Sequence, residues 1–142
     1  MNDQQTPYAA AILRITLGTI LVAHALLKIL VFTLPGTAGF FASQGFPGWM
    51  AYPVVLIELL GGVAMVAGFQ TRLAAIAAIP VLLGALLVHS ANGWLFTSQN
   101  GGWEYPALLV VLAAVVALLG DGAFSLAAAL RTPLAPKMKH TH

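Results

Sequence analysis

The chain contains no cysteine, and charged residues make up only 7% of its 142 residues. The absence of cysteine excludes disulfides, thiolate metal sites and thiol redox chemistry on this chain. A soluble domain has about 25% charged residues, whereas 60% of this chain is hydrophobic. A soluble protein of this size could not bury so many apolar side chains, so we expect lipid to surround most of the chain.

Other common features are also missing. The net charge is only +2, and no basic patch with interleaved aromatic residues is present, so nucleic acid is not an expected partner. No haem, flavin or iron–sulfur motif is recognisable. The N-terminus has no basic segment ahead of its long apolar run, which predicts a retained first helix rather than a cleaved signal peptide.

Four long apolar segments are present, and each approaches the roughly 20 residues that a membrane-spanning helix needs. They cover residues 7–34, 50–69, 71–91 and 103–119. A short interfacial helix, capped by Thr37, is expected between the first two segments, and another short helix over 122–130. The predicted fold class is therefore all-α: a polytopic membrane protein with a four-transmembrane-helix bundle. Residues 1–131 are expected to form one domain and 132–142 a disordered cytoplasmic tail.

The basic residues near the ends of the segments predict an orientation. Arg72 follows the second segment, and Arg131, Lys137 and Lys139 follow the fourth, whereas the other two connections contain no lysine or arginine. Because cytoplasmic loops carry an excess of these residues, both termini are expected on the cytoplasmic side of the membrane.

Ionisable residues from all four segments are expected in the outer half of the bundle; they are His24, Lys28, Glu58, His89 and Glu104. Such groups are costly to expose to lipid, so they should face one another in an interior polar site. Lys28 has two possible placements: it pairs with Glu58 or Glu104, or it extends to the headgroups. Arg14 is expected to pair with Asp121 or with a phosphate.

Two glycines follow Glu58 on the same helix face. Gly61 and Gly62 stand three and four positions after it, which places all three on one side of a helix. The missing side chains favour either close packing of two helices or an open notch for a flat ligand.

The chain resembles the DoxX family of small four-helix bacterial membrane proteins. The resemblance rests on "RITLGTILVAHALLKI", "IELLGGVAMVAGFQTRLAA", "HSANGW", "NGGWEYPALL" and "GDGAFSL", in this order between Leu13 and Leu126. The resemblance implies a bundle in the bacterial cytoplasmic (inner) membrane and a link to thiosulfate:quinone oxidoreductases, redox stress or sulfur transfer. The family's polar residues correspond here to Arg14, His24, Lys28, Glu58, Arg72, His89 and Glu104. The closing segment departs from the family pattern, because it lacks a basic residue and a final aspartate.

These observations lead to three hypotheses. In the first, the chain is a quinone-interacting subunit of a membrane oxidoreductase: His24 and Glu58 transfer protons, Lys28 stabilises negative charge, and Gly61, Gly62, His89 and Glu104 complete the cofactor site. Electrons then come from a redox partner protein or a bound small molecule. In the second, His24, Glu58, His89 and Glu104 hold a metal ion. In the third, the bundle is a non-enzymatic membrane assembly or partner-binding protein whose buried charges fix helix pairing. Besides lipid, the expected partner is a redox protein or further copies of the chain in a homo-oligomer.

Overall fold

The computed structural model of the chain describes residues 3–132, and every regular element in that range is a helix. The predicted all-α fold class is confirmed. The first long segment is α1 (Thr6–Leu26), which continues directly into a π-helical turn, η1 (Leu27–Val31). The tail predicted over 132–142 lies outside the described residues, apart from Thr132.

The second long segment combines three kinds of helical turn. It begins with a 3₁₀ turn, η2 (Gly48–Met50), and continues as α3 (Ala51–Leu56). A π-helical turn, η3 (Ile57–Gly61), then joins α3 to α4 (Gly62–Ala67). Together these elements form a continuous span of 20 residues.

The third and fourth segments are α5 (Thr71–His89) and α6 (Glu104–Leu119). The helix of α5 is continuous through Pro80 and is followed by a 3₁₀ turn, η4 (Ser90–Asn92). Within the described residues, three stretches are long and apolar enough to cross a membrane: Thr6–Val31, Gly48–Ala67 and Thr71–Asn92. Helix α6 is apolar but has only 16 residues, so it is about 24 Å long and shorter than a hydrocarbon core of roughly 30 Å.

The short helix α2 (Leu34–Ser43) lies between the first two long segments, where an interfacial helix was expected. The prediction that Thr37 caps it is wrong, because the cap is Thr33, whose hydroxyl accepts a hydrogen bond from the Gly36 N–H at 3.2 Å. Thr37 is buried inside the helix, and its hydroxyl contacts the carbonyls of Thr33 at 2.9 Å and Lys28 at 3.3 Å. These contacts attach α2 to the end of the first segment.

The last helix, α7 (Leu126–Arg131), begins four residues later than predicted. Gly120, Gly122 and Phe124 all have positive φ angles, which a right-handed helix does not allow. The Ser125 hydroxyl then caps α7 by accepting a hydrogen bond from the Ala128 N–H at 3.2 Å.

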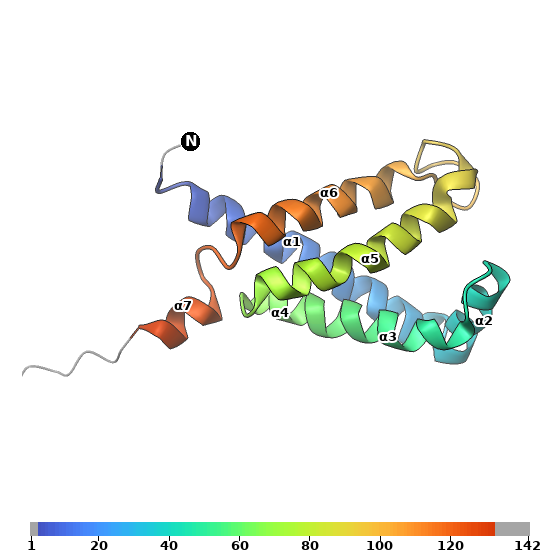
Figure 1. Ribbon diagram of the computed structural model, residues 1–142, viewed down its shortest axis with the longest axis horizontal. Helices are drawn as coiled ribbons and strands as arrows, with labels where there is room; N and C mark the ends of the chain where they lie inside the picture. Colours follow the sequence, from blue (N-terminus) through green and yellow to red (C-terminus); the bar gives the residue numbers. More distant parts are fainter. Residues whose placement is uncertain (1–2, 133–142) are drawn as a thin grey trace, which may run out of the picture.

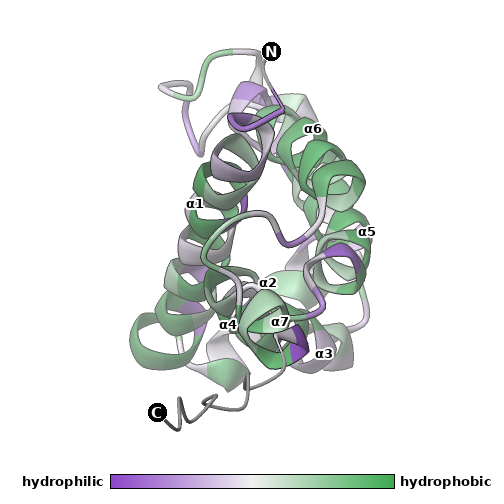
Figure 2. Ribbon diagram, turned by 90° about the vertical axis from the view of Figure 1, so that its left-hand side faces the viewer, coloured by the Kyte–Doolittle hydropathy of each residue, from purple (hydrophilic) through white to green (hydrophobic). Residues whose placement is uncertain are grey.

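The long helices run side by side, with α1 packed along α4 and η3, and α5 packed along α6 and η3 (Figure 1). Helix α2 and the α5–α6 loop lie at one end of the bundle, which we call the α2 end. The α4–α5 turn and α7 lie at the opposite end, which we call the α7 end (Figure 1). Seen along the bundle, the helices are coloured mainly in the hydrophobic range (Figure 2).

Small residues allow the helices to approach one another closely. The core consists mainly of leucine and alanine side chains, with Met65 and Val116 fully buried. At the crossing of α1 and α4, a Cβ added to Gly18 would lie 2.7 Å from the Gly62 carbonyl oxygen, and one added to Gly62 would lie 2.8 Å from the Gly18 carbonyl oxygen. The two backbones are therefore in direct contact, as small residues permit in membrane helix pairs.

Candidate functional site

The central feature of the site is an ion pair between the first and second long segments. The Lys28 ammonium donates hydrogen bonds to both carboxylate oxygens of Glu58, at 2.7 and 2.8 Å. Side-chain exposure is 19% for Lys28 and 6% for Glu58, so the pair is largely removed from solvent. Of the two predicted placements of Lys28, the structure has the pairing with Glu58.

Both members of this pair lie in π-helical turns. Lys28 belongs to η1 and Glu58 to η3. A π-helical turn inserts an extra residue into the helix, rotates the following side chains and is frequent at functional sites. Both charged residues therefore lie where the helix departs from regular α-helical periodicity, and nothing in the spacing of apolar residues predicts these turns.

The ion pair lines a cavity of about 570 Å³ at the α2 end, which we call the Lys28–Glu58 cavity. Its wall is mostly apolar and includes Phe40, Phe41 and Phe46 from α2 and the loop that follows. Residues of α5 from Pro80 to His89 form another part of the wall. The size and lining are typical of a small-molecule site, where a few polar groups are placed in an apolar pocket.

Two histidines also line the cavity, and the geometry of each indicates which ring nitrogen carries a proton. The Nδ1 atom of His24 lies 2.8 Å from the Ile20 carbonyl oxygen, and that of His89 lies 2.9 Å from the Gly101 carbonyl oxygen. A carbonyl can only accept, so each Nδ1 is the donor and each Nε2 is available to a ligand. The His24 ring also stacks on Tyr105, with the ring centroids 6.4 Å apart.

The structure therefore brings four of the five predicted outer residues to one cavity: His24, Lys28, Glu58 and His89. Glu104 is not part of the wall, because its carboxylate accepts a hydrogen bond from the Phe96 N–H at 3.2 Å in the α5–α6 loop. Within the described residues His24 and Glu58 are not hydrogen-bonded to each other: the His24 Nδ1 contacts the Ile20 carbonyl, and both Glu58 oxygens accept from Lys28.

The four residues of the metal hypothesis do not converge. Within residues 3–132, no three histidine, aspartate or glutamate side chains lie close enough together to hold one ion. A zinc site needs three or four such ligands at about 2 Å from the metal, and here the Glu58 carboxylate is already bonded to an ammonium group.

The two glycines after Glu58 lie outside the cavity wall. Gly62 contacts the α1 backbone, while a Cβ on Gly61 would come no closer than 3.8 Å to the Ala74 carbonyl oxygen of α5. Of the two expectations for this pair, the geometry supports close packing of helices rather than an open notch beside the carboxylate.

Arg14 makes different contacts from those predicted. Its side chain is fully buried and donates to five backbone carbonyls, those of Met65, Val66, Asp121, Ala123 and Phe124. All five guanidinium donors are thereby used. The Asp121 carboxylate instead accepts a hydrogen bond from the Thr71 N–H at 3.2 Å. Arg14 therefore joins α1, α4 and the loop before α7.

Some cavity residues were missed by sequence reasoning. Tyr105, Gln44 and the phenylalanines of α2 all line the wall. Tyr105 directly follows Glu104 at the start of a predicted helix, which is the one signal that could have identified it. The aromatic residues of α2 were expected only to contact the membrane interface.

Fold and site together define a small helical membrane protein with an ion pair inside an apolar cavity. The chain belongs to the DoxX family, whose sequence profile matches residues 9–91. The family assignment made from the sequence motifs is thus confirmed.

Two relatives show how far the similarity extends. The protein "Putative oxidoreductase CatD" of Bacillus subtilis (strain 168) is 33% identical over 110 residues, which cover 78% of this chain and 78% of the relative. The "Inner membrane protein YqjF" of Escherichia coli (strain K12) is 32% identical over 124 residues, covering 75% of this chain and 88% of the relative. No solved structure matches the chain.

Proposed function

We propose that the Lys28–Glu58 cavity binds a quinone and that the chain is the quinone-interacting subunit of a membrane oxidoreductase. The observation that carries this proposal is a charged, hydrogen-bonding pair inside a cavity of otherwise mostly apolar wall, in a protein embedded in lipid. A quinone is a flat apolar ring with two acceptor oxygens, and it dissolves in the bilayer. The name of the Bacillus relative, which contains the word oxidoreductase, agrees with this class of function.

The donors in the wall fit the oxygens of such a ring. Two of the three Lys28 ammonium protons are directed at Glu58, which leaves one for a ring oxygen. The Tyr105 side chain is a further donor in the same wall, and His24 Nε2 becomes one when the ring is in its imidazolium form. The phenylalanines of α2 offer flat apolar surface to the ring.

Conversion of a quinone to a quinol takes up two electrons and two protons. We assign proton supply to His24 and to the Lys28–Glu58 pair, whose groups would exchange protons with the ligand through hydrogen bonds. The electrons are assigned to a separate redox partner protein, because the sequence contains no haem, flavin or iron–sulfur motif.

We further propose the bacterial inner membrane as the location, with both termini cytoplasmic. The name of the Escherichia relative supports the location, and the basic residues at the α7 end support the orientation. Because the chain has no native cysteine, single cysteines at Gln99 and Asp3 would report the side directly. We expect a thiol reagent added from the periplasm to label Gln99→Cys and not Asp3→Cys. The opposite labelling pattern would show that the termini are periplasmic.

The test of the quinone proposal is the quinone content of protein purified in mild detergent. We expect close to one quinone per chain in the wild type, and loss of most of it in His24→Ala and Glu58→Gln. Glu104→Gln is the matched control, because it makes the same chemical change at the α2 end but outside the cavity wall. It should retain quinone.

The proposal fails if well-folded wild type contains no quinone above the level carried by the detergent. It also fails if folded His24→Ala and Glu58→Gln retain as much quinone as Glu104→Gln. In either case, the cavity is not a stable quinone site.

A further inference from the structure

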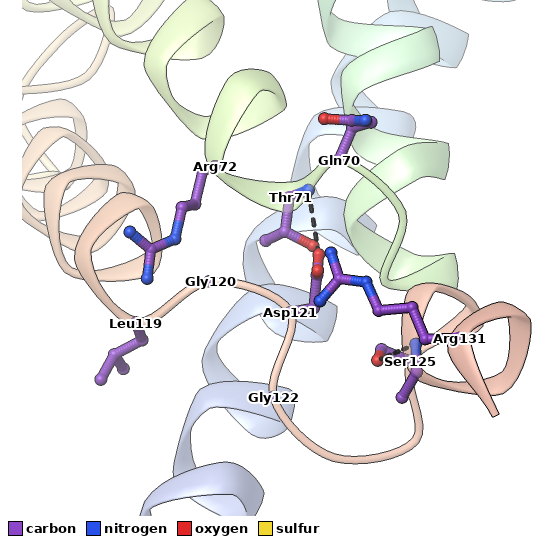
Figure 3. A pocket seen from close by; sticks show the side chains of 10 residues that line it. Gln70, Thr71, Arg72, Leu119, Gly120, Asp121, Gly122, Ser125 and Arg131 are labelled. Carbon is purple, nitrogen blue, oxygen red and sulfur yellow. Dashed lines mark hydrogen bonds between the residues drawn. The ribbon is translucent and has the colours of Figure 1, made fainter.

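A second pocket lies at the α7 end, far from the ion pair, and it has a different chemical character. It has a volume of about 400 Å³ and is lined by Thr71 and Arg72 of α5, by the Gly120–Gly122 loop and by Arg131 of α7. Figure 3 shows Arg72 and Arg131 on either side of Asp121. We call it the Arg72–Arg131 pocket.

The pocket has an excess of positive charge. Arg72 and Arg131 contribute two positive charges and Asp121 one negative charge, which leaves a net charge of +1 in the lining. Within residues 3–132 neither arginine is in an ion pair, since Lys28 and Glu58 form the one pair of that kind. The Asp121 carboxylate is held by the Thr71 N–H.

A buried polar atom in the wall also lacks a partner. Thr71 is fully buried, and its hydroxyl oxygen makes no hydrogen bond within the described part of the chain. An unsatisfied buried hydroxyl is unfavourable and needs an explanation, such as a ligand that completes its hydrogen bonding. Thr71 is also the first residue of α5, and its N–H at this helix N-terminus already holds the Asp121 carboxylate, so the hydroxyl is the group left for a ligand.

The wall of the pocket is held in place from behind. Arg14 binds the carbonyls of Asp121, Ala123 and Phe124, and the Ala127 N–H donates to the Gly68 carbonyl at 3.1 Å. A Cβ on Gly120 would lie 2.9 Å from the Arg72 Nε. Because glycine has no Cβ, the Arg72 guanidinium can lie against the backbone at this point. The backbone of the wall is therefore fixed, and it presents the exposed Arg72 and Arg131 side chains on either side of Asp121.

Apolar side chains beside the pocket indicate a lipid. Phe124, which precedes α7, is 82% exposed. Leu130 of α7 is 68% exposed, and Leu126 of the same helix is also exposed. Such residues on a short helix with a basic end are typical of an element lying in the membrane interface. The net charge of +1 matches the single negative charge of a phosphodiester.

We propose that the Arg72–Arg131 pocket binds the phosphodiester headgroup of a phospholipid. The two guanidinium groups bind the phosphate oxygens, the Thr71 hydroxyl contributes a hydrogen bond, and Phe124, Leu126 and Leu130 contact the acyl chains. Arginine is suited to this role because its planar fork of donors matches phosphate oxygens.

The test is binding of short-chain lipids to the full chain in detergent, measured by native mass spectrometry. The probes are dioctanoyl phosphatidylglycerol, dioctanoylglycerol with the same chains but no phosphate, and inorganic phosphate. We expect saturable binding of the phosphatidylglycerol and none of the dioctanoylglycerol. Arg72→Gln and Arg131→Gln should each weaken the affinity about tenfold, because each removes a charged donor.

Gln99→Glu is the control variant, because it lowers the net charge of the chain at the opposite end of the bundle and should bind as the wild type does. Equal binding of the two dioctanoyl lipids would overturn the proposal, and so would unchanged affinity in both arginine variants. Tighter binding of inorganic phosphate than of phosphatidylglycerol, with the same dependence on Arg72 and Arg131, would overturn the lipid assignment and identify a site for soluble phosphate.

Discussion

The ion pair between Lys28 and Glu58 should show strong energetic coupling in a double-mutant cycle. Glu58→Gln leaves an ammonium group in the cavity without its counter-charge, and removal of one partner of a buried pair costs about 3–5 kcal/mol. The side chains are 19% and 6% exposed, which places the expected cost toward the lower value, about 3 kcal/mol. Lys28→Met leaves the less exposed carboxylate without its partner and should cost a similar amount.

The double variant leaves no unpaired charge, so we expect it to be much less destabilised than the sum of the single variants. A coupling free energy of about 2–3 kcal/mol follows, at the upper end of the range for residues in contact. The assay is unfolding of the purified protein in mixed micelles, followed by circular dichroism. If the two single effects add within about 0.5 kcal/mol, the pair is not formed in the membrane, and Lys28 extends to the headgroups instead.

Two further predictions concern packing and buried hydrogen bonds. Gly62→Ala should destabilise the fold by about 1–3 kcal/mol, because the new methyl group would lie 2.8 Å from the Gly18 carbonyl oxygen. Gly61→Ala, with its nearest contact at 3.8 Å, should be neutral or slightly stabilising, and equal losses in the two variants would contradict the close helix crossing. Arg14→Lys should lower the unfolding free energy by about 3 kcal/mol or more, because lysine has three donors for five carbonyls. Arg72→Lys, on an exposed side chain, should change stability by less than about 0.5 kcal/mol. Thermal unfolding in detergent measures the stability of the two glycine variants and of the two arginine variants. If the Arg14→Lys protein is as stable as the Arg72→Lys protein, the role given to Arg14 is refuted.

The location of the site was largely predictable. Helices of known length that alternate in direction bring residues of similar depth together, so His24, Lys28, Glu58 and His89 were expected near one another, and all four line one cavity. The structure also brings Arg72 and Asp121 together at the other end, where they line the second pocket. Depth is predictable because it depends only on the rise per residue and on the loops.

The partners of these residues were not predictable. Arg14 was expected to bind the Asp121 carboxylate, yet it binds backbone carbonyls that become available only where the chain leaves α4 and approaches α7. Glu104 has the predicted depth but is directed into the α5–α6 loop. A side chain's partner depends on its rotation around the helix axis and on irregular backbone, and neither leaves a pattern in the sequence.

The sequence by itself determined that this is a helical membrane protein of the DoxX family, because apolar length, scarcity of charge and ordered motifs are properties of the chain. It also predicted that ionisable residues from all four segments would collect in one half of a bundle. Only the tertiary structure decided that Lys28 pairs with Glu58 and that Gly62 packs on Gly18. It also showed that two arginines share a pocket with an unpartnered threonine hydroxyl. Lys28 and Glu58 both lie in π-helical turns, where side chains do not follow the regular α-helical periodicity, which is the physical reason that residue spacing alone does not predict this pair.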